Sequence, residues 1–167
     1  HSRCHYFFAQ HLHALGKFAE ERERLDQALA ADPTDADVLI ALYRIPEKSA
    51  AERNRVMTLI RKASTEYRLE IEKYQREFDR QGSAGQLRTF LEGRLASANN
   101  LLAWLVSNTE GDFDEALQCS QRSLEIRPDS AGFYDTLGRC YFAKGDLSNA
   151  IKFQSRAAKL EPHSGMI

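Results

Sequence analysis

The chain has 167 residues, of which 43% are hydrophobic and 28% charged, and its formal net charge is −1 at pH 7. This length suits one compact domain or one short repeat array with a buried core. The near-balance of charge argues against nucleic acid as the main partner, because phosphate binding requires a basic excess. No run approaches the roughly 18 apolar residues of a membrane span, so none is expected.

Both ends of the sequence look cut. It begins HSRCHYFFAQ without an initiator Met and stops at HSGMI, directly after a helix-ending pattern. We therefore expect a fragment of a larger protein. A signal peptide could have been lost from such a fragment, so the compartment stays open, with the cytoplasm slightly favoured.

Three cysteines lie far apart, at Cys4, Cys119 and Cys140, and no CxxC motif occurs. This spacing predicts free thiols that pack as small apolar side chains. An activated thiol is the less favoured alternative.

Residues 1–33 form the first predicted helical hairpin. It turns at Gly16 and ends at Pro33, and its apolar positions are Phe8, Ala9, Leu12, Phe18, Leu25 and Ala28. Glu21 stands where a small residue is expected between two close helices. Its charge must tilt outwards or find a partner, so we expect this hairpin to splay slightly.

Residues 34–94 depart from this pattern and predict an expanded hairpin. A helix over Thr34–Ile45, capped by Thr34, ends at Pro46. A long amphipathic helix follows over about Ala50–Arg80, which at 1.5 Å per residue is about 46 Å long. Its apolar stripe has spacings of three and four and comprises Val56, Ile60, Ala63, Tyr67, Ile71, Tyr74 and Phe78.

A turn at Gly82–Gly85 leads into a second long helix. One face of this helix carries Leu87, Leu91, Leu95, Ala98, Leu102 and Leu105. Because the helix runs directly into the next unit, the hairpin is oversized and should project beyond the array. We interpret its charged surface as a solvated face with pairs such as Glu72–Arg76, and a projecting arm for dimerisation or docking is the alternative.

Residues 95–128 predict the third hairpin. Its first helix has the pattern Asn99-x2-Leu102-Ala103-x2-Val106. This helix lies one residue further from its turn glycine, Gly111, than in the last unit, so we expect one extra residue in the turn Ser107–Glu110. Asp112 followed by Glu115 predicts a capping box.

Residues 129–162 predict the last hairpin. Its pattern is Tyr134-x2-Leu137-Gly138-x2-Tyr141, then Gly145-Asp146, Ala150, Ala157 and Pro162. Gly138 and Ala150 are small because two antiparallel helices approach closely there. Gly145 can adopt the left-handed conformation that ends a helix, and Asp146 can cap the next helix.

A glycine precedes a proline by 17 residues in the first, third and last hairpins, and the last two prolines are 34 residues apart. This period and the pattern of the last hairpin resemble the tetratricopeptide repeat (TPR), most specifically over residues 1–33 and 95–162. The run RPDSAGFYDTLGRCYFAKGD is similar to units of large bacterial TPR proteins.

The resemblance implies an all-α, TPR-like superhelix of about four helical hairpins with one oversized central hairpin. It implies a single array over residues 1–167. Within it, residues 1–33 are repeat 1, 34–94 are a degenerate and expanded repeat, and 95–128 and 129–162 are repeats 3 and 4.

TPR proteins as a family hold peptides or helices in a concave groove that the first helix of each repeat lines. The resemblance therefore implies such a groove here, walled by aromatic, amide and charged residues. These are Tyr6, Gln10, His13, Arg44, Asn100, Trp104, Asp135, Arg139 and Phe142, with Ile40 and Ser107 beside them. This mixed surface suits a ligand with apolar and polar anchors. Packing between helices, or plain hydration, is the alternative role for each residue.

Other kinds of site are not expected. The family's carboxylate clamp for acidic tails needs Lys and Asn where the first helix here has Tyr and Gln. His1 and His5 are one helical turn apart, but His11 and His13 lie on different faces and no other ligands converge with them. The sequence has no GxSxG, P-loop, HExxH or GxGxxG motif. We therefore predict no catalytic residues, no metal and no cofactor.

The last helix, Asn149–Leu160, has apolar residues that cannot all point inwards, namely Ile151, Phe153, Ala157 and Leu160. We expect an exposed apolar patch that a capping helix or a dimer partner covers. The alternative is that residues 163–167 fold back over it.

From these features we expect a protein-interaction scaffold rather than an enzyme, with another protein or a peptide as its partner. One alternative is an accessory domain that positions a catalytic or secretion module in a larger protein. A structural oligomerisation module is another. A homodimer through the uncapped C-terminal end or the long central hairpin is left open.

Overall fold

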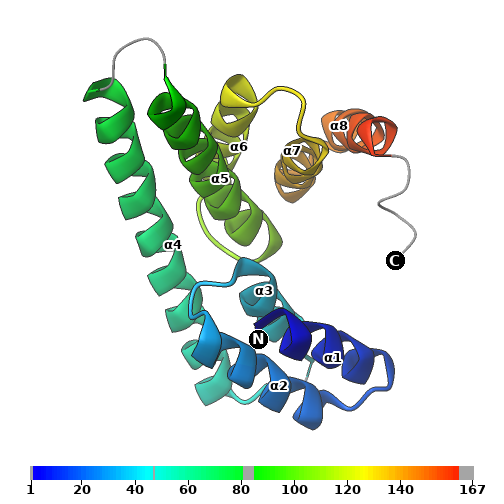
Figure 1. The fold of residues 1–167 in the computed structure, drawn as a ribbon. Helices are drawn as coiled ribbons and strands as arrows, with labels where there is room; N and C mark the ends of the chain where they lie inside the picture. The colour runs from blue at the N-terminus through cyan, green and yellow to red at the C-terminus, as the bar shows by residue number, and fades with distance from the viewer. Residues whose placement is uncertain (1, 47, 81–84, 162–167) are drawn as a thin grey trace. The chain divides into compact units, whose positions relative to one another are not determined.

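The computed structural model describes residues 2–46, 48–80 and 85–161, which form eight α-helices and no β-strand (Figure 1). The predicted all-α class is confirmed. The packing divides the chain into two compact units, His1–Glu66 and Tyr67–Ile167, with the boundary inside the longest helix.

The first unit contains α1 (Ser2–Ala14), α2 (Phe18–Ala31), α3 (Ala36–Arg44) and the first half of α4 (Ala50–Arg80). α1 and α2 form an antiparallel hairpin (Figure 1). Gly16 ends α1 with a φ of +71°, and the N–H of Lys17 donates to the carbonyl of Leu12 over 3.0 Å. This is a Schellman-type ending, so the predicted turn at Gly16 is confirmed.

Glu21 finds a partner inside this hairpin. It is 2% exposed, and the Nδ1 atom of His13 lies 3.1 and 3.0 Å from its two carboxylate oxygens. The His13 ring also lies edge-on to Phe18, with 5.5 Å between ring centroids. Because a buried carboxylate is costly without a partner, this pair lets a charged residue occupy the interface between α1 and α2.

The N-terminal cap of α3 differs from the prediction. Asp35 is the cap, and its carboxylate accepts hydrogen bonds from the backbone N–H groups of Asp37 and Val38 (3.1 and 3.2 Å). Thr34 lies one residue too early in the chain, and both its N–H and its hydroxyl donate to Asp32 instead. The helix ends before Pro46, as predicted.

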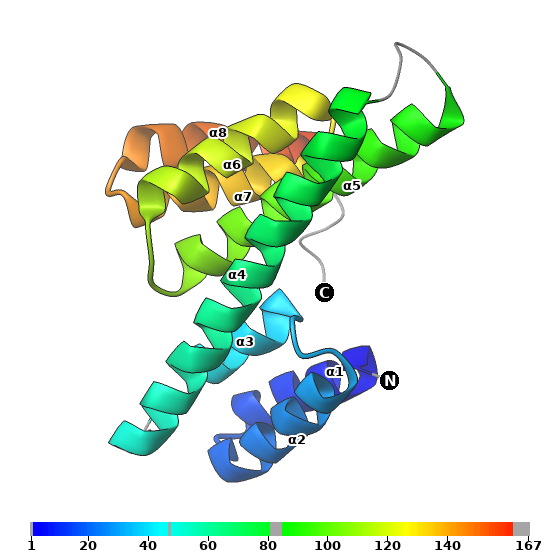
Figure 2. The same cartoon turned by 90° about the vertical axis from the view of Figure 1, so that its left-hand side faces the viewer.

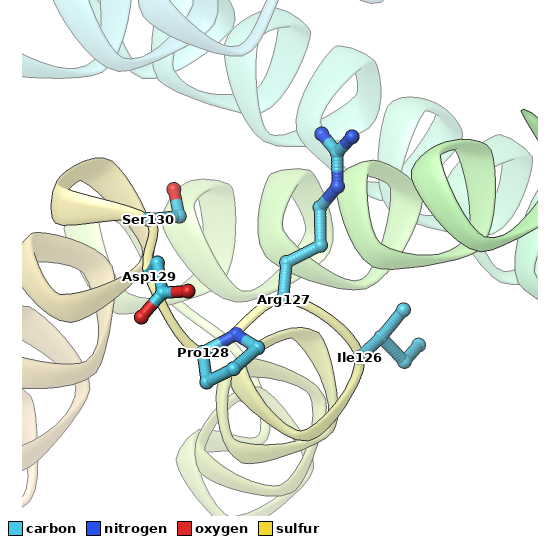
Figure 3. A pocket seen from close by; sticks show the side chains of 5 residues that line it. All are labelled: Ile126, Arg127, Pro128, Asp129 and Ser130. Carbon is cyan, nitrogen blue, oxygen red and sulfur yellow. The ribbon is translucent and has the colours of Figure 1, made fainter. Parts of the chain in front are cut away.

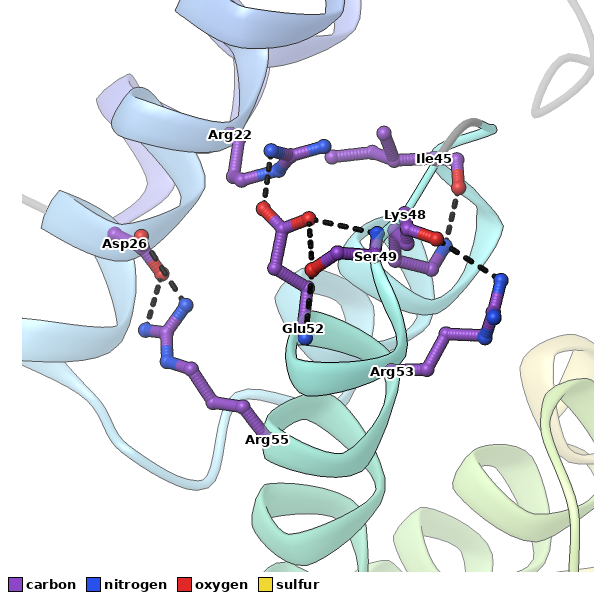
Figure 4. Close-up of polar contacts among 8 residues, drawn as sticks. All are labelled: Arg22, Asp26, Ile45, Lys48, Ser49, Glu52, Arg53 and Arg55. Atoms are coloured by element: carbon purple, nitrogen blue, oxygen red, sulfur yellow. Dashed lines mark hydrogen bonds and ion pairs between the residues drawn. The ribbon is translucent and has the colours of Figure 1, made fainter.

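Side chains cap both helix ends in the segment between α3 and α4 (Figure 4). Lys48 Nζ donates to the carbonyl of Tyr43 over 2.7 Å and also to that of Ile45. Ser49 and Glu52 form a reciprocal capping box, in which Ser49 N–H donates to the Glu52 carboxylate (2.9 Å) and Glu52 N–H to Ser49 Oγ (3.2 Å). The bond from the Ser49 backbone is the main cause that lowers the pKa of Glu52.

Two ion pairs join α2 to α4 within the first unit (Figure 4). Arg22 pairs with Glu52, and Arg55 Nη2 lies 2.6 Å from Asp26 Oδ1. All four side chains are partly exposed, so each pair adds little to stability and mainly fixes how the two helices face each other.

The second unit contains the rest of α4 together with α5 (Gln86–Asn108), α6 (Phe113–Ile126), α7 (Ala131–Ala143) and α8 (Leu147–Leu160). α5 and α6 form one hairpin, α7 and α8 form the next, and α7 packs against both α5 and α6 (Figure 2). The buried apolar residues of these hairpins include Leu95, Leu102, Leu105, Val106, Ala116, Leu137, Cys140 and Ala150.

The turns of the two hairpins differ in length as predicted. Two residues separate α7 from the cap Asp146, whereas three residues separate α5 from the cap Asp112. Both turns contain a glycine with positive φ, +80° at Gly145 and +150° at Gly111. The extra residue therefore changes the turn without changing the hairpin.

The predicted capping box at α6 forms only in part. The carboxylate of Asp112 accepts from the N–H of Glu115 over 3.1 Å, as a cap should. The Glu115 side chain accepts two hydrogen bonds of 2.7 Å from Arg68 on α4. A contact with another helix thus engages the side chain that the local pattern assigned to the box.

The long helices meet the prediction along most of their length. α4 has 31 residues over the predicted bounds, and Tyr74 on it packs against Leu91, Leu95 and Ala98 of α5. Leu87, predicted on the same face, is 52% exposed, so the covered stripe of α5 begins one turn later. The predicted turn at Gly82–Gly85 lies outside the described residues except for Gly85. Throughout the described ranges, no helix combines the length and apolarity needed to cross a membrane.

α8 leaves apolar surface open, as predicted. Leu160 is 43% exposed and Ile151 is 68% exposed. Phe153 is half-buried because it stacks on Tyr134 and Tyr141 of α7, with centroid distances of 6.2 and 5.4 Å. Residues 163–167, the alternative cover for this surface, lie outside the described residues.

Candidate functional site

Five of the nine predicted groove residues lie on two helices that pack against each other. Asn100 and Trp104 are on α5, and Asp135, Arg139 and Phe142 are on α7. Within each helix the spacing is three or four residues, which places the side chains on one face. The second unit therefore carries a row of these residues on each of two neighbouring helices, here called the α5–α7 surface.

Arg139 connects the two rows. Its Nε donates to the backbone carbonyl of Ser107 at the end of α5 over 3.2 Å. Its guanidinium carbon lies 5.0 Å from the ring centroid of Phe142, one turn further along α7. Because Phe142 is 52% exposed, the surface presents an aromatic ring with a cation held beside it.

The α5 side of the surface is polar and aromatic. Asn100 has a buried Oδ1 atom with no hydrogen-bond partner among the described residues. Trp104 is half-buried, and its carbonyl accepts from the side chain of Asn108 over 2.9 Å. On α7, the carbonyl of Asp135 accepts from Gln154 of α8 over 2.9 Å, which links α7 to the last helix.

The other four predicted residues, Tyr6, Gln10, His13 and Arg44, belong to the first unit. Gln10 donates to the hydroxyl of Tyr6 over 2.7 Å. Burial, and next the negative charge of Asp37, raise the pKa of this tyrosine. Arg44 is exposed near the end of α3. His13 pairs with Glu21 of α2, so its ring is part of the hairpin contact that sequence reasoning missed.

A shallow pocket of about 400 Å³ lies elsewhere, at the turn between α6 and α7 (Figure 3). It is lined by Ile126, Arg127, Pro128, Asp129 and Ser130. The Arg127 guanidinium reaches to α5, where a Cβ atom added to Gly93 would lie 3.9 Å away. None of the nine predicted residues lines this pocket.

The thiols are positioned as packing groups in two of three cases. Burial raises the pKa of both Cys119 and Cys140 to about 11, so both stay protonated at neutral pH. Cys140 is fully buried, and its Sγ lies 3.6 Å from the carbonyl of Ala116. Cys4 is exposed, contrary to the prediction that all three pack inside.

The hairpins α5–α6 and α7–α8 follow one another, and each is turned by a glycine with positive φ and capped by an aspartate, as in a helical-hairpin repeat protein. A family model of the tetratricopeptide repeat matches residues 96–130 and 131–164. These two segments are tetratricopeptide repeats. Such repeats support the role of a protein-interaction scaffold. The predicted first repeat and the expanded segment 34–94 lie outside the matched residues and stay predictions.

Among solved structures, the chain is similar to BtubC from P. vanneervenii, with 19% identity, a TM-score of 0.50, and coverage of 99% of this chain and 65% of that one. It is also similar to MamA from Desulfovibrio magneticus RS-1 (15% identity, TM-score 0.38, 98% and 96% covered). Acl4, an assembly chaperone of RpL4, gives 15% identity and a TM-score of 0.39, with 98% and 62% covered.

At such identities the likeness shows the fold alone. The chain spans less than two thirds of BtubC and of Acl4. Comparison with curated protein sequences finds no significant match.

Proposed function

We propose that this scaffold binds a peptide segment or a helix of a partner protein across the α5–α7 surface. The observation that carries the proposal is Arg139, which bonds to α5 and lies beside the exposed ring of Phe142. Because these contacts already order the long cationic side chain, less side-chain entropy is lost when a ligand binds to it.

Each residue of the surface has a role that its chemistry suits. Trp104 and Phe142 supply apolar area for an anchor side chain, and such aromatic residues are enriched where interface energy concentrates. Arg139 attracts an acidic group of the ligand. Asn100 adds an amide group to the α5 side of the surface, and its Oδ1 atom is buried.

The residues of the first unit form a second surface of the same kind in this proposal. Within that unit, Tyr6 and Gln10 on α1 and Arg44 on α3 are the residues that contact a bound segment. His13 contributes indirectly, because its contact with Glu21 orients the end of α1. In this arrangement residues 1–33 are the first repeat and residues 34–94 the expanded repeat of one array.

The test is a peptide-display selection on the full chain, followed by calorimetric Kd measurements for a selected peptide. Phe142→Ala and Arg139→Ala should each weaken binding about tenfold or more, equivalent to about 1.4 kcal/mol. Thr58→Ala, on the exposed surface of α4, is the matched control and should leave the Kd unchanged. Selected peptides whose affinity survives both surface variants would contradict the proposal.

A further inference from the structure

The last helix differs in charge from the chain that contains it. α8 carries Lys152, Arg156 and Lys159 and no acidic residue, although the whole chain has a net charge of −1. The spacings of four and three residues place these cations along one line of the helix surface. All three residues are exposed.

These cations have no acidic partner in the part of the chain that the structure describes. Lys152 Nζ lies 5.2 Å from the ring centroid of Phe153, and the guanidinium carbon of Arg156 lies 4.6 Å from that of Tyr134. Both contacts are with aromatic faces, which attract a cation without neutralising it. The positive charge of this line is therefore available to an acidic group from outside.

Stacked aromatic rings fix the helix that carries these cations. Phe153 stacks on both Tyr134 and Tyr141 of α7 and is nearly parallel to each, at interplanar angles of 12° and 11°. Arg156 then lies over one of these rings. Because the rings fix α8 on α7, the line of cations presents a defined spacing rather than a diffuse charge.

A second line on α8 is apolar and exposed. Leu147 is 57% exposed, Ile151 is 68% exposed, and Ala158 follows two turns later on the same side. At 100° per residue this line lies about 120° from the line of cations. The two serines Ser148 and Ser155 lie between the lines, so a helix laid along them meets little steric bulk.

We propose that this outer face of α8 docks an amphipathic helix of a partner protein whose apolar side faces Ile151 and whose flank carries acidic residues opposite Lys152, Arg156 and Lys159. Charge complementarity selects this occupant. An anionic membrane surface fits less well, because membrane-bound helices use a broad apolar face and here a polar line separates the narrow apolar line from the cations. The α8 face is distinct from the α5–α7 surface, so the two can be tested separately.

The probe is a synthetic helical peptide of about four turns with leucines on one face and glutamates along the adjacent flank. A matched peptide has lysines in place of the glutamates, and vesicles of phosphatidylserine and phosphatidylcholine test the membrane. The full chain should bind the acidic peptide at least tenfold more tightly than the basic one. It should bind that peptide and should not bind the vesicles.

The deciding variant is the double charge reversal Lys152→Glu with Lys159→Glu, which leaves the Arg156 contact with Tyr134 intact. It should weaken the acidic peptide at least tenfold and make the basic peptide the better ligand. Arg61→Glu with Lys62→Glu, an equal charge change on the exposed side of α4, should alter neither affinity. Unchanged thermal unfolding of both variants shows that the fold survives.

Three outcomes would overturn the inference. The first is equal binding of the two peptides, or no binding of either. The second is an affinity for the acidic peptide that the α4 control reversal lowers as much as the α8 reversal. The third is binding of the chain to vesicles that depends on Lys152 and Lys159, without binding of the acidic peptide.

Discussion

Gly138 lies at the closest approach of α7 to α8. A Cβ atom added there would lie 2.8 Å from Gln154 Cγ and 3.1 Å from the backbone oxygen of Ala150. The glutamine side chain can move, but the backbone oxygen cannot move without shifting α8. The sequence pattern predicted this contact from two small residues, and the structure gives its physical reason.

Gly138→Leu should lower the free energy of unfolding by about 1–3 kcal/mol, because the crossing would be overpacked. Gly132→Ala is the matched control in the same helix, since nothing lies within 4 Å of a Cβ there. It should be neutral or slightly stabilising, because alanine favours a helix more than glycine does. Urea unfolding of both variants decides, and equal stability of the two would refute the close-approach argument.

Glu21 and His13 make a second prediction at this scale. His13→Ala removes the partner of a carboxylate that is 2% exposed and should cost about 1–3 kcal/mol. Glu21→Ala removes the buried charge itself and gives the small residue that the repeat favours at this position. The double variant should therefore be more stable than His13→Ala alone.

Thermal or urea unfolding of these three variants measures the coupling directly. Additive losses in the double variant would show that the pair contributes nothing as a unit. The sequence identified Glu21 as a charge that needs a partner but did not identify His13 as that partner, because the two residues lie on different helices, eight positions apart.

At the scale of helices, the sequence predicted what depends on local pattern. The bounds of α4, the positive φ of Gly145, and the extra residue before Asp112 all match the structure. Each follows from the spacing of apolar residues or from a residue with a particular backbone preference. Such features need no knowledge of neighbouring helices.

Capping was less predictable, for two different reasons. Thr34 and Asp35 both have side chains that cap helices well. Asp35 is the cap because the helix begins at Ala36, directly after it. Glu115 was assigned to Asp112 by its spacing, but Arg68 of α4 engages it. The Ser49–Glu52 capping box has the Ser-x-x-Glu motif. The sequence was therefore sufficient to predict it, but it was not predicted.

Side-chain environments across helices were the least predictable part of the candidate site. The repeat pattern placed Asn100, Trp104, Asp135, Arg139 and Phe142 on first helices, and their positions on α5 and α7 agree with that. No spacing rule could predict that Arg139 reaches the carbonyl at the end of α5, because that contact depends on how two helices pack.

At the scale of the whole molecule, the period of glycines and prolines was sufficient to predict a repeat protein, and the family match over residues 96–164 bears this out. The division into two units was not predicted, because its boundary falls inside the uninterrupted helix α4. A continuous amphipathic stripe carries no mark of where one packed unit ends and the next begins.

Hydrogen–deuterium exchange of the full chain, with and without a display-selected peptide, shows which helices bind the ligand. If the α5–α7 surface binds the ligand, amides around residues 97–107 and 135–143 should gain protection on binding, and those on the exposed side of α4 should not. Protection confined to α4, or to the outer side of α2, would contradict the account.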